Sequence, residues 1–176
     1  ADYVTNTTPP PSGDLPKVGD KFVIYNQNAK AVLAEQNDNT DSPAINKALA
    51  EIKDGKAIPA NGAVVFEVQE HEDFLRFYNE TYGYLCSSGT GNNAFYSKTA
   101  SNDADWTVRE CSGNAGGFEM EHRTAKFNNK RSQWLEYYSD SFKTYSMYNV
   151  TDYTIYSFYF YPVAGGVNVT DGIVNM

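Results

Sequence analysis

Short apolar runs with a period of two dominate the sequence and restrict the folds open to it. Clusters of Gly, Asn, Asp and Ser separate these runs, which are KFVIYN, AVVFEVQ, DFLRFYN, DWTVRE, GFEMEH, SQWLEYY and YSFYFYPV. Such alternation is typical of half-buried strands. The segment PAINKALAEIKDGK spaces Ile45, Leu49 and Ile52 as a helix would, but its alternating alanines fit a strand equally well. The sequence therefore predicts an all-β fold and leaves this one segment open.

Two kinds of run recur three times along the chain. The first is a short strand centred on a leucine, found at Leu33, Leu85 and Leu135. The second alternates apolar residues and begins at Phe66, Trp106 and Phe158. Repeats of about 40 to 50 residues with about four strands each predict a β-trefoil, in which six strands close a barrel and six cap one end. These six apolar side chains would then meet on one axis. A β-sandwich with similar strands is the alternative.

The ends of the chain differ in composition from its middle. Residues 1–17 contain three consecutive prolines with Ser, Thr and Gly, which is typical of an extended linker. In residues 164–176, the pair Gly165 and Gly166 ends the alternation, and the segment is too short to fold alone. We therefore expect one folded domain over residues 18–163, followed by a C-terminal tail or linker.

Charge and composition restrict the partners. The formal net charge is -8 and the pI is about 4.7, so no basic surface is expected to bind nucleic acid. No apolar run approaches the roughly 18 residues of a membrane span, and the first residues lack the features of a signal peptide. We expect no membrane insertion and a signal peptide, if any, already removed. Abundant Asn, Thr, Ser and Tyr with few lysines favour a secreted or cell-surface protein.

The two cysteines, Cys86 and Cys111, allow one pairing. A disulfide between them would close a loop of about 25 residues and stabilise the fold by about 3 kcal/mol. Two buried thiols are the alternative, and two cysteines are too few for a structural zinc site. The loop from Asn37 to Asp41 offers oxygen ligands but lacks the glycine and closing glutamate of a calcium loop. No metal and no other cofactor is expected.

Catalytic motifs are missing from the sequence. It contains no GxSxG, HExxH, CxxC or P-loop pattern. His71 falls in an expected solvated turn, and His122 at an expected strand end. Alternation places Glu67, Glu119 and Glu136 on outward positions, where a carboxylate keeps its ordinary pKa and cannot serve as a tuned general acid. The sequence therefore predicts a protein that is not an enzyme.

Outward aromatic residues are the strongest functional signal in the chain. If Leu135 points into the barrel, alternation places Trp134, Glu136 and Tyr138 outside. Tyr and Trp can stack on the C–H face of a sugar ring while nearby polar groups bind its hydroxyls. The sequence thus predicts a binding surface for a polysaccharide or an oligosaccharide.

The candidate carbohydrate-binding residues lie in two stretches. In the last third of the chain they are Asn128, Asn129, Lys130, Arg131, Trp134, Tyr138, Asp140, Tyr145 and Tyr148. In the middle of the chain they are Asn92, Asn93 and Tyr96. Tyr159 and Tyr161 are also expected to point outward, since Phe158 points in. The alternative is a protein-interaction module, either a trefoil-type protease inhibitor with residues 87–105 as its reactive loop or a structural spacer.

Three stretches carry a resemblance to a known family. GDKFVIYNQNAKAVL, DADWTV and QWLEYYSDSFKTYSMYNVTDYTIYSFYFYPV resemble a repeat-built β module of large secreted and surface proteins of anaerobic Gram-positive gut bacteria. Such proteins include starch-adherence proteins, so the resemblance implies a carbohydrate-binding module of a larger multidomain protein, with an α-glucan such as starch as ligand. It covers about residues 18–163. The segment 35–62, the NNKRSQ insertion and the cysteine pair depart from the family pattern.

Overall fold

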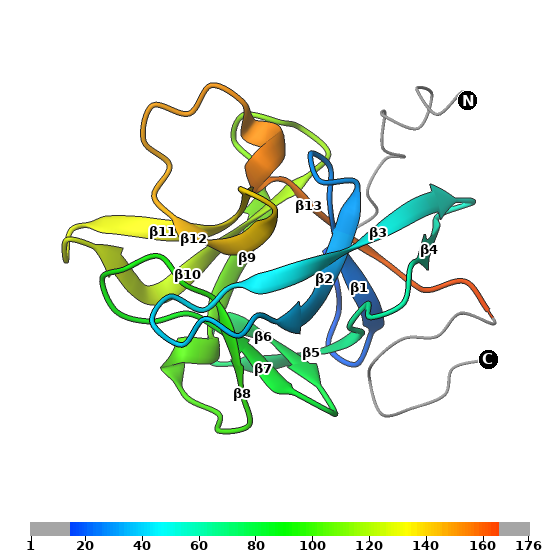
Figure 1. Ribbon diagram of the computed structural model, residues 1–176, viewed down its shortest axis with the longest axis horizontal. Helices are drawn as coiled ribbons and strands as arrows, with labels where there is room; N and C mark the ends of the chain where they lie inside the picture. Colours follow the sequence, from blue (N-terminus) through cyan, green and yellow to red (C-terminus); the bar gives the residue numbers. More distant parts are fainter. Residues whose placement is uncertain (1–14, 166–176) are drawn as a thin grey trace.

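The computed structural model describes residues 15–165, which form strands and two short 3-10 helices (Figure 1). The strands are β1 (Lys21–Asn26), β2 (Ala31–Gln36), β3 (Ile45–Lys53), β4 (Lys56–Pro59), β5 (Phe66–His71), β6 (Phe74–Asn79), β7 (Gly83–Cys86), β8 (Phe95–Ser97), β9 (Trp106–Glu110), β10 (Phe118–Phe127), β11 (Arg131–Tyr138), β12 (Ser141–Tyr145) and β13 (Phe158–Tyr161). The helices are η2 (Asn102–Ala104) and η3 (Tyr153–Tyr156). The predicted all-β fold is confirmed.

The predicted terminal segments fall largely beyond this range. Residues 1–14 of the expected linker and residues 166–176 of the expected tail lie outside the described residues. No helix within residues 15–165 is long and apolar enough to cross a membrane.

Antiparallel pairing closes a ring through six strands. β1 pairs with β5, β5 with β6, β6 with β9, β9 with β10, β10 with β13, and β13 again with β1. A closed ring leaves no open sheet edge in the barrel wall. Two separate facing sheets would not produce this ring, so the β-sandwich alternative is wrong.

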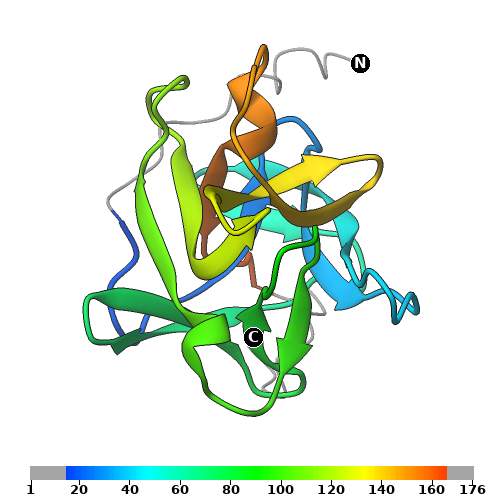
Figure 2. The same ribbon diagram turned by 90° about the vertical axis from the view of Figure 1, so that its left-hand side faces the viewer.

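Three hairpins extend from the barrel strands. β2 pairs with β3, β7 with β8, and β11 with β12, and each hairpin is entered from a barrel strand that pairs with its first member. The same order of pairings therefore occurs in residues 21–71, 74–110 and 118–161 (Figures 1 and 2). This arrangement is β-trefoil-like.

One apolar core fills the barrel. The six side chains that were expected to meet inside it are all fully buried in a single cluster, namely Leu33, Leu85, Leu135, Phe66, Trp106 and Phe158. The indole nitrogen of Trp106 donates to the carbonyl of Leu85 at 3.0 Å, which satisfies its one polar group without water. Alternation in the sequence thus predicted the inward positions correctly.

Three buried polar side chains join neighbouring segments at one end of the barrel: Asn26 on β1, Asn79 on β6 and His122 on β10. Asn26 and Asn79 each accept from the backbone of the turn that follows, whereas His122 accepts from Thr124 and Ala125 within β10, where the register with β11 shifts. Each of the three side chains donates to a carbonyl that precedes the adjacent barrel strand. The amide of Asn26 accepts from Ala29 N–H at 2.9 Å and donates to the Ser157 carbonyl at 3.2 Å. Within residues 15–165, no buried side-chain nitrogen or oxygen lacks a partner.

Asn79 and His122 show the same geometry with different chemistry. Asn79 donates to the Val65 carbonyl at 2.8 Å and accepts from the N–H of Tyr82, also at 2.8 Å. Nδ1 of His122 accepts from the N–H of Ala125 at 2.9 Å, so its proton is on Nε2, which donates to the Asp103 carbonyl at 2.7 Å. Burial lowers the pKa of His122 and favours this neutral form. His122 lies inside β10, so its expected place at a strand end was wrong.

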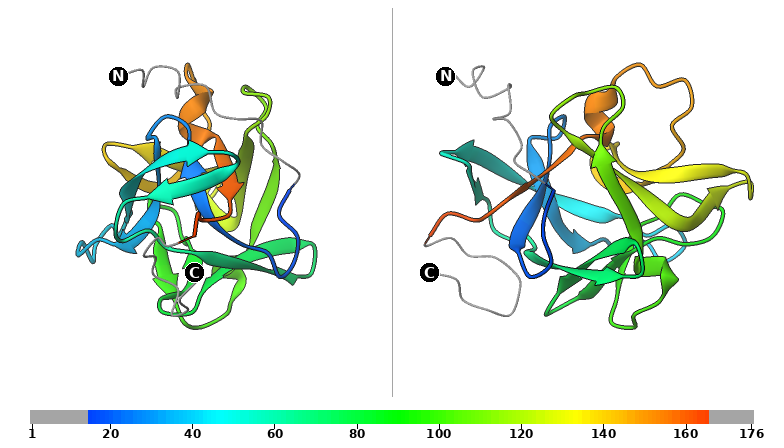
Figure 3. Two further views of the ribbon diagram at one scale, coloured as in Figure 1. Left: turned by 90° about the vertical axis from the view of Figure 1, so that its right-hand side faces the viewer. Right: turned by 180° about the vertical axis from the view of Figure 1, so that it is seen from behind.

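A second cluster covers the outside of β1 and β13. The segment left open by the sequence forms β3, which pairs with β4 in a hairpin lying over this face (Figure 3). Tyr159 and Tyr161, which were expected to point into solvent, pack here with Tyr25 and are only 3% and 4% exposed. They do point out of the barrel, but the β3–β4 hairpin buries them. Their expected exposure was therefore wrong.

The two cysteines are separate, buried thiols. The predicted Cys86–Cys111 disulfide is wrong, because the two thiols are free and buried at separate positions, Cys86 on β7 and Cys111 just after β9. Burial raises the pKa of the Cys86 thiol to about 12. A thiol with this pKa is almost never a thiolate and is chemically inert at neutral pH.

Replacement of Asn79 tests how much the hydrogen bonds of the buried polar side chains stabilise the fold. Asn79→Ala is expected to lower the free energy of unfolding by about 2 to 3 kcal/mol, because the buried Val65 carbonyl loses its donor. Urea denaturation followed by fluorescence measures it. Asn61→Ala, at an exposed asparagine, is the control and should change stability by less than about 0.5 kcal/mol. Equal effects of the two substitutions would contradict the role assigned to Asn79.

The thiols give a second test of the fold. A reducing agent is expected to leave the thermal midpoint unchanged, since no disulfide restrains the chain. A thiol reagent should react slowly with the native protein and rapidly with two thiols per chain in denaturant. A midpoint that drops on reduction would show that the cysteines do pair.

Candidate functional site

The β11–β12 hairpin presents aromatic side chains on its outer surface. Trp134 lies directly opposite Tyr145 in the antiparallel register, so both side chains are on one face, and Tyr138 follows four residues along the same strand. The rings of Tyr138 and Tyr145 meet edge to face with centroids 5.8 Å apart. Tyr138 is 60% exposed, whereas Trp134 and Tyr145 are half-buried.

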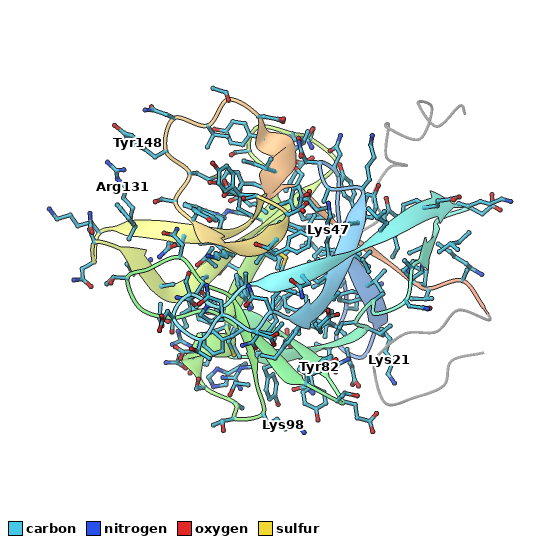
Figure 4. All side chains as sticks on the ribbon, viewed as in Figure 1. Lys21, Lys47, Tyr82, Lys98, Arg131 and Tyr148 are labelled. Atoms are coloured by element: carbon cyan, nitrogen blue, oxygen red, sulfur yellow. The ribbon has the colours of Figure 1, made fainter. Side chains whose placement is uncertain are left out.

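Tyr148 lies beyond the end of β12, against Arg131, the first residue of β11. Its side chain is 60% exposed, and the guanidinium carbon of Arg131 lies 3.9 Å from its ring centroid (Figure 4). Arginine stacked on a tyrosine ring keeps its N–H donors at the rim, where a ligand can reach them. We call Arg131, Trp134, Tyr138, Tyr145 and Tyr148 the β11–β12 face.

The remaining candidates of this stretch lie nearby with other contacts. Asn128 and Asn129 form the tight turn before β11 with φ of 53° and 61°, and Lys130 follows them, exposed to solvent. Asparagine tolerates this left-handed backbone better than most residues. Asp140 forms an ion pair at 2.8 Å with Lys47. The turn thus adjoins Arg131, whereas Asp140 already has a partner.

The candidates in the middle of the chain have structural contacts. Asn92 donates to the Thr144 carbonyl at 2.8 Å, and the Asn93 carbonyl accepts from Thr144 N–H at 3.1 Å. Tyr96 stacks on Tyr82 and donates to the Ala34 carbonyl at 2.6 Å. These bonds hold residues 87–94 against β12. The expected inhibitor loop is therefore packed against the body over this stretch and has no disulfide at its root.

Glu136 faces out of the barrel as expected, but it is not exposed to solvent. It points out of the barrel but is only 6% exposed, because η3 and the ring of Tyr156 cover it. Burial raises the pKa of the Glu136 carboxyl to about 7, and a hydrogen bond with the Tyr156 hydroxyl offsets part of this effect. The expected ordinary pKa was wrong. No local pattern in the sequence indicates that η3 would cover this position.

Glu119 is the second buried outward carboxylate. It is 4% exposed and forms an ion pair at 3.0 Å with Nε of Arg109, while Nε1 of Trp134 donates to it at 3.2 Å. Its expected exposure was also wrong, since Trp134 and the segment after Cys111 cover it. Glu119 therefore anchors the ring of Trp134 in the β11–β12 face. Glu67, the third expected outward carboxylate, does remain partly exposed.

His71 lies against a buried carboxylate instead of in open solvent. Its Nδ1 is 3.1 Å from Asp105, whose side chain is fully buried and also binds Arg76 at 2.6 Å and Arg123 at 2.8 Å. Burial alone would raise the pKa of Asp105, but hydrogen bonds from Arg76, Arg123 and His71 outweigh it and hold the pKa below its usual value. This cluster joins β5, β6 and β10 and is a structural feature of the barrel wall.

Possible metal ligands do not cluster in the part of the chain that the structure describes. Within residues 15–165, no three or more His, Cys, Asp or Glu side chains are arranged to hold a metal ion. In the loop considered for calcium, the amide oxygens of Asn37 and Asn39 accept backbone N–H groups. Both amide oxygens are thus already engaged within this loop.

Comparisons with known proteins bear on the fold. No protein-family model matches the chain, and no curated protein matches it in sequence. SeviL, solved bound to the asialo-GM1 saccharide, is similar with a TM-score of 0.56 at 12% identity, over 84% of this chain and 100% of that chain. The β-trefoil of BEL is similar with a TM-score of 0.57 at 12% identity, over 88% of this chain and 100% of that chain. A salivary protein from Culex quiquefasciatus is similar with a TM-score of 0.56 at 17% identity, over 86% of this chain and 98% of that chain. These similarities show a β-trefoil-like fold.

The buried carboxyl of Glu136 predicts a pH dependence of stability. Between pH 4.5 and 7 the folded protein retains a proton that the unfolded chain has lost, so the free energy of unfolding falls as pH rises through this range. The fall is about 3 kcal/mol, because each pKa unit corresponds to about 1.4 kcal/mol. Glu136→Gln is expected to remove it in urea titrations at several pH values. Glu70→Gln, at an exposed strand position, should retain it. Equal pH profiles for Glu136→Gln and the wild type would refute the assignment.

Proposed function

We propose that this protein is a non-catalytic carbohydrate-binding module that binds sugar through the β11–β12 face. The observation that carries the proposal is the exposure of Tyr138 and Tyr148, which leave 60% of their surfaces in solvent. Both tyrosines belong to the aromatic-rich stretch 134–161, only part of whose aromatic side chains lie in the core. A flat apolar ring in solvent is what a sugar C–H face requires for stacking.

The surroundings of the two rings supply hydrogen-bonding groups. Arg131 stacks on Tyr148, and the turn of Asn128, Asn129 and Lys130 precedes it directly. Amide, ammonium and guanidinium groups at the rim of a stacked ring can bind sugar hydroxyls and fix the orientation of the sugar. Because most of these groups are solvated, we expect affinities in the micromolar to millimolar range.

An α-glucan such as starch is the ligand that we propose first. The support for an α-glucan is the resemblance of the chain to modules of starch-adherence proteins. The similarity in fold to SeviL, which was solved with the asialo-GM1 saccharide bound, supports carbohydrate binding in general. From the same resemblance we propose that the chain is secreted or displayed at the cell surface, as one module of a larger protein of a gut bacterium.

The positions of the buried carboxyls support a non-catalytic role. Glycoside hydrolysis needs two carboxyl groups that reach the scissile bond from either side. Glu119 is ion-paired with Arg109 and covered by Trp134, and Glu136 lies beneath Tyr156. Neither carboxyl is positioned to touch a sugar on the β11–β12 face.

Substitution of the exposed tyrosines tests the proposal. Tyr138→Ala and Tyr148→Ala are each expected to weaken binding of maltoheptaose by about 5- to 30-fold, because each removes a stacking contact of about 1 to 2 kcal/mol. Isothermal titration calorimetry measures the affinity, and retention on starch gives an independent readout. Both side chains are exposed, so the fold should be unaffected.

Leu49→Ala is the matched control, since Leu49 is also 60% exposed but lies on β3. It should bind as the wild type does. A glycan panel that includes starch, cellulose and mucin extends the test to other sugars. If the wild-type protein binds none of them, the carbohydrate-binding proposal is wrong.

A further inference from the structure

A second group of tyrosines lies on the outside of the barrel, away from the β11–β12 face. Phe77 on β6 and Leu85 on β7 are fully buried in the core, so their neighbours Tyr78 and Tyr84 point outward. The two tyrosines are directly opposite each other in the antiparallel register. Their ring centroids are 5.0 Å apart with an angle of 55° between the ring planes.

Polar side chains hold this pair in place. The hydroxyl of Tyr84 donates to Oε1 of Gln69 at 3.2 Å, and the guanidinium carbon of Arg76 lies 5.9 Å from the Tyr84 ring centroid. Arg76 is itself fixed by its 2.6 Å bond to the buried Asp105. Glu67 lies opposite Tyr78 on β5. We call Glu67, Gln69, Arg76, Tyr78 and Tyr84 the β5–β7 face.

Packing within the fold explains these tyrosines less completely than it explains those on the other side of the barrel. Tyr25, Tyr159 and Tyr161 also point outward, but the β3–β4 hairpin covers them to 4% exposure or less. Every residue of the β5–β7 face stays partly exposed. A tyrosine pair that is held by a ring contact and by the Tyr84 hydrogen bond, and is still partly exposed, needs little ordering on binding, which reduces the entropic cost.

We infer that the β5–β7 face is a second carbohydrate-binding surface, which takes an uncharged sugar ring against Tyr78 and Tyr84. The amide nitrogen of Gln69 can donate to a sugar hydroxyl while its oxygen accepts from Tyr84, and the Glu67 carboxylate can accept from another hydroxyl. Lys21 lies opposite Glu67 in the register of β1 and β5. Charges of both signs therefore flank the pair, which favours a neutral glycan over an acidic one.

This inference rests on the proposed function and extends it. In Figures 1 and 2 the β11–β12 hairpin lies in the upper part of the molecule and β6–β8 in the lower part. Two faces that point in different directions allow one chain to hold two glycan segments. On a polysaccharide with many equivalent segments, the second binding event becomes intramolecular, so retention exceeds the affinity of either face.

Stoichiometry with a short oligosaccharide tests the inference. Calorimetric titration of the full chain with maltoheptaose is expected to give two sites, and Tyr78→Ala should reduce them to one. Tyr148→Ala combined with Tyr78→Ala should leave one site, weakened by about 5- to 30-fold as in Tyr148→Ala alone. Retention on starch should fall about tenfold or more for either single variant, because each loses bivalent attachment.

Conservative variants separate binding from folding. Tyr84→Phe keeps the ring but loses the bond to Gln69, and it should retain the second site, whereas Tyr84→Ala should lose it at an unchanged thermal midpoint. One site in the wild type, unaffected by Tyr78→Ala and Tyr84→Ala, would overturn the second surface and leave the proposed function intact. Binding lost with Tyr78→Ala but retained with Tyr138→Ala and Tyr148→Ala would overturn the β11–β12 face instead. No binding to maltoheptaose or to any glycan of the panel would overturn both.

Discussion

The barrel depends on three buried side chains that connect each segment to its neighbour. Asn26 and Asn79 accept from backbone N–H groups of the turn that follows each of them, and His122 accepts from N–H groups further along β10. All three side chains donate to a carbonyl that precedes an adjacent strand. Backbone polar groups at these positions are shielded from water, so they would lose free energy if left unpaired. Two asparagines and one neutral histidine meet this requirement because each offers both an acceptor and a donor a few ångströms apart. The three positions therefore share one acceptor and one donor that bind the backbone, although the residue type differs.

The inward side chains of the barrel were predicted correctly because each depends only on the alternation within its own strand. An inward side chain is set by the phase of alternation along its own strand, and Leu33, Leu85 and Leu135 mark that phase in three places. The outside depends on segments far away in the chain. Tyr159 is covered by the β3–β4 hairpin, and the sequence pattern of this segment fitted a helix and a strand equally well. Glu136 is covered by η3, for which the alternation gives no sign.

The candidate site was predictable to the extent that its residues belong to one hairpin. Trp134, Tyr138 and Tyr145 follow from strand register, which a local pattern can supply. The middle-chain candidates were different in kind. Asn92 and Asn93 occur in a glycine-rich stretch that resembles a solvated loop, yet their amide and carbonyl groups bind Thr144, some fifty residues away. Hydrogen bonds of this range leave no periodic signal, so sequence reasoning could not separate them from groups free to bind a ligand.

The same side chain therefore takes opposite roles in this fold according to what lies over it. Tyrosines on the outer wall contribute to stability where the β3–β4 hairpin buries them, and they are open to a ligand on the β11–β12 and β5–β7 faces. Carboxyl groups follow the same logic, since Glu136 has its pKa raised by burial while Asp105, equally hidden, has its pKa lowered by three basic partners. Outward direction alone thus implies neither exposure nor an ordinary pKa. In this closed barrel, the chain segments that cross the outer wall decide which outward residues remain exposed, and the aromatic residues that they leave exposed are the ones on which the proposed binding depends.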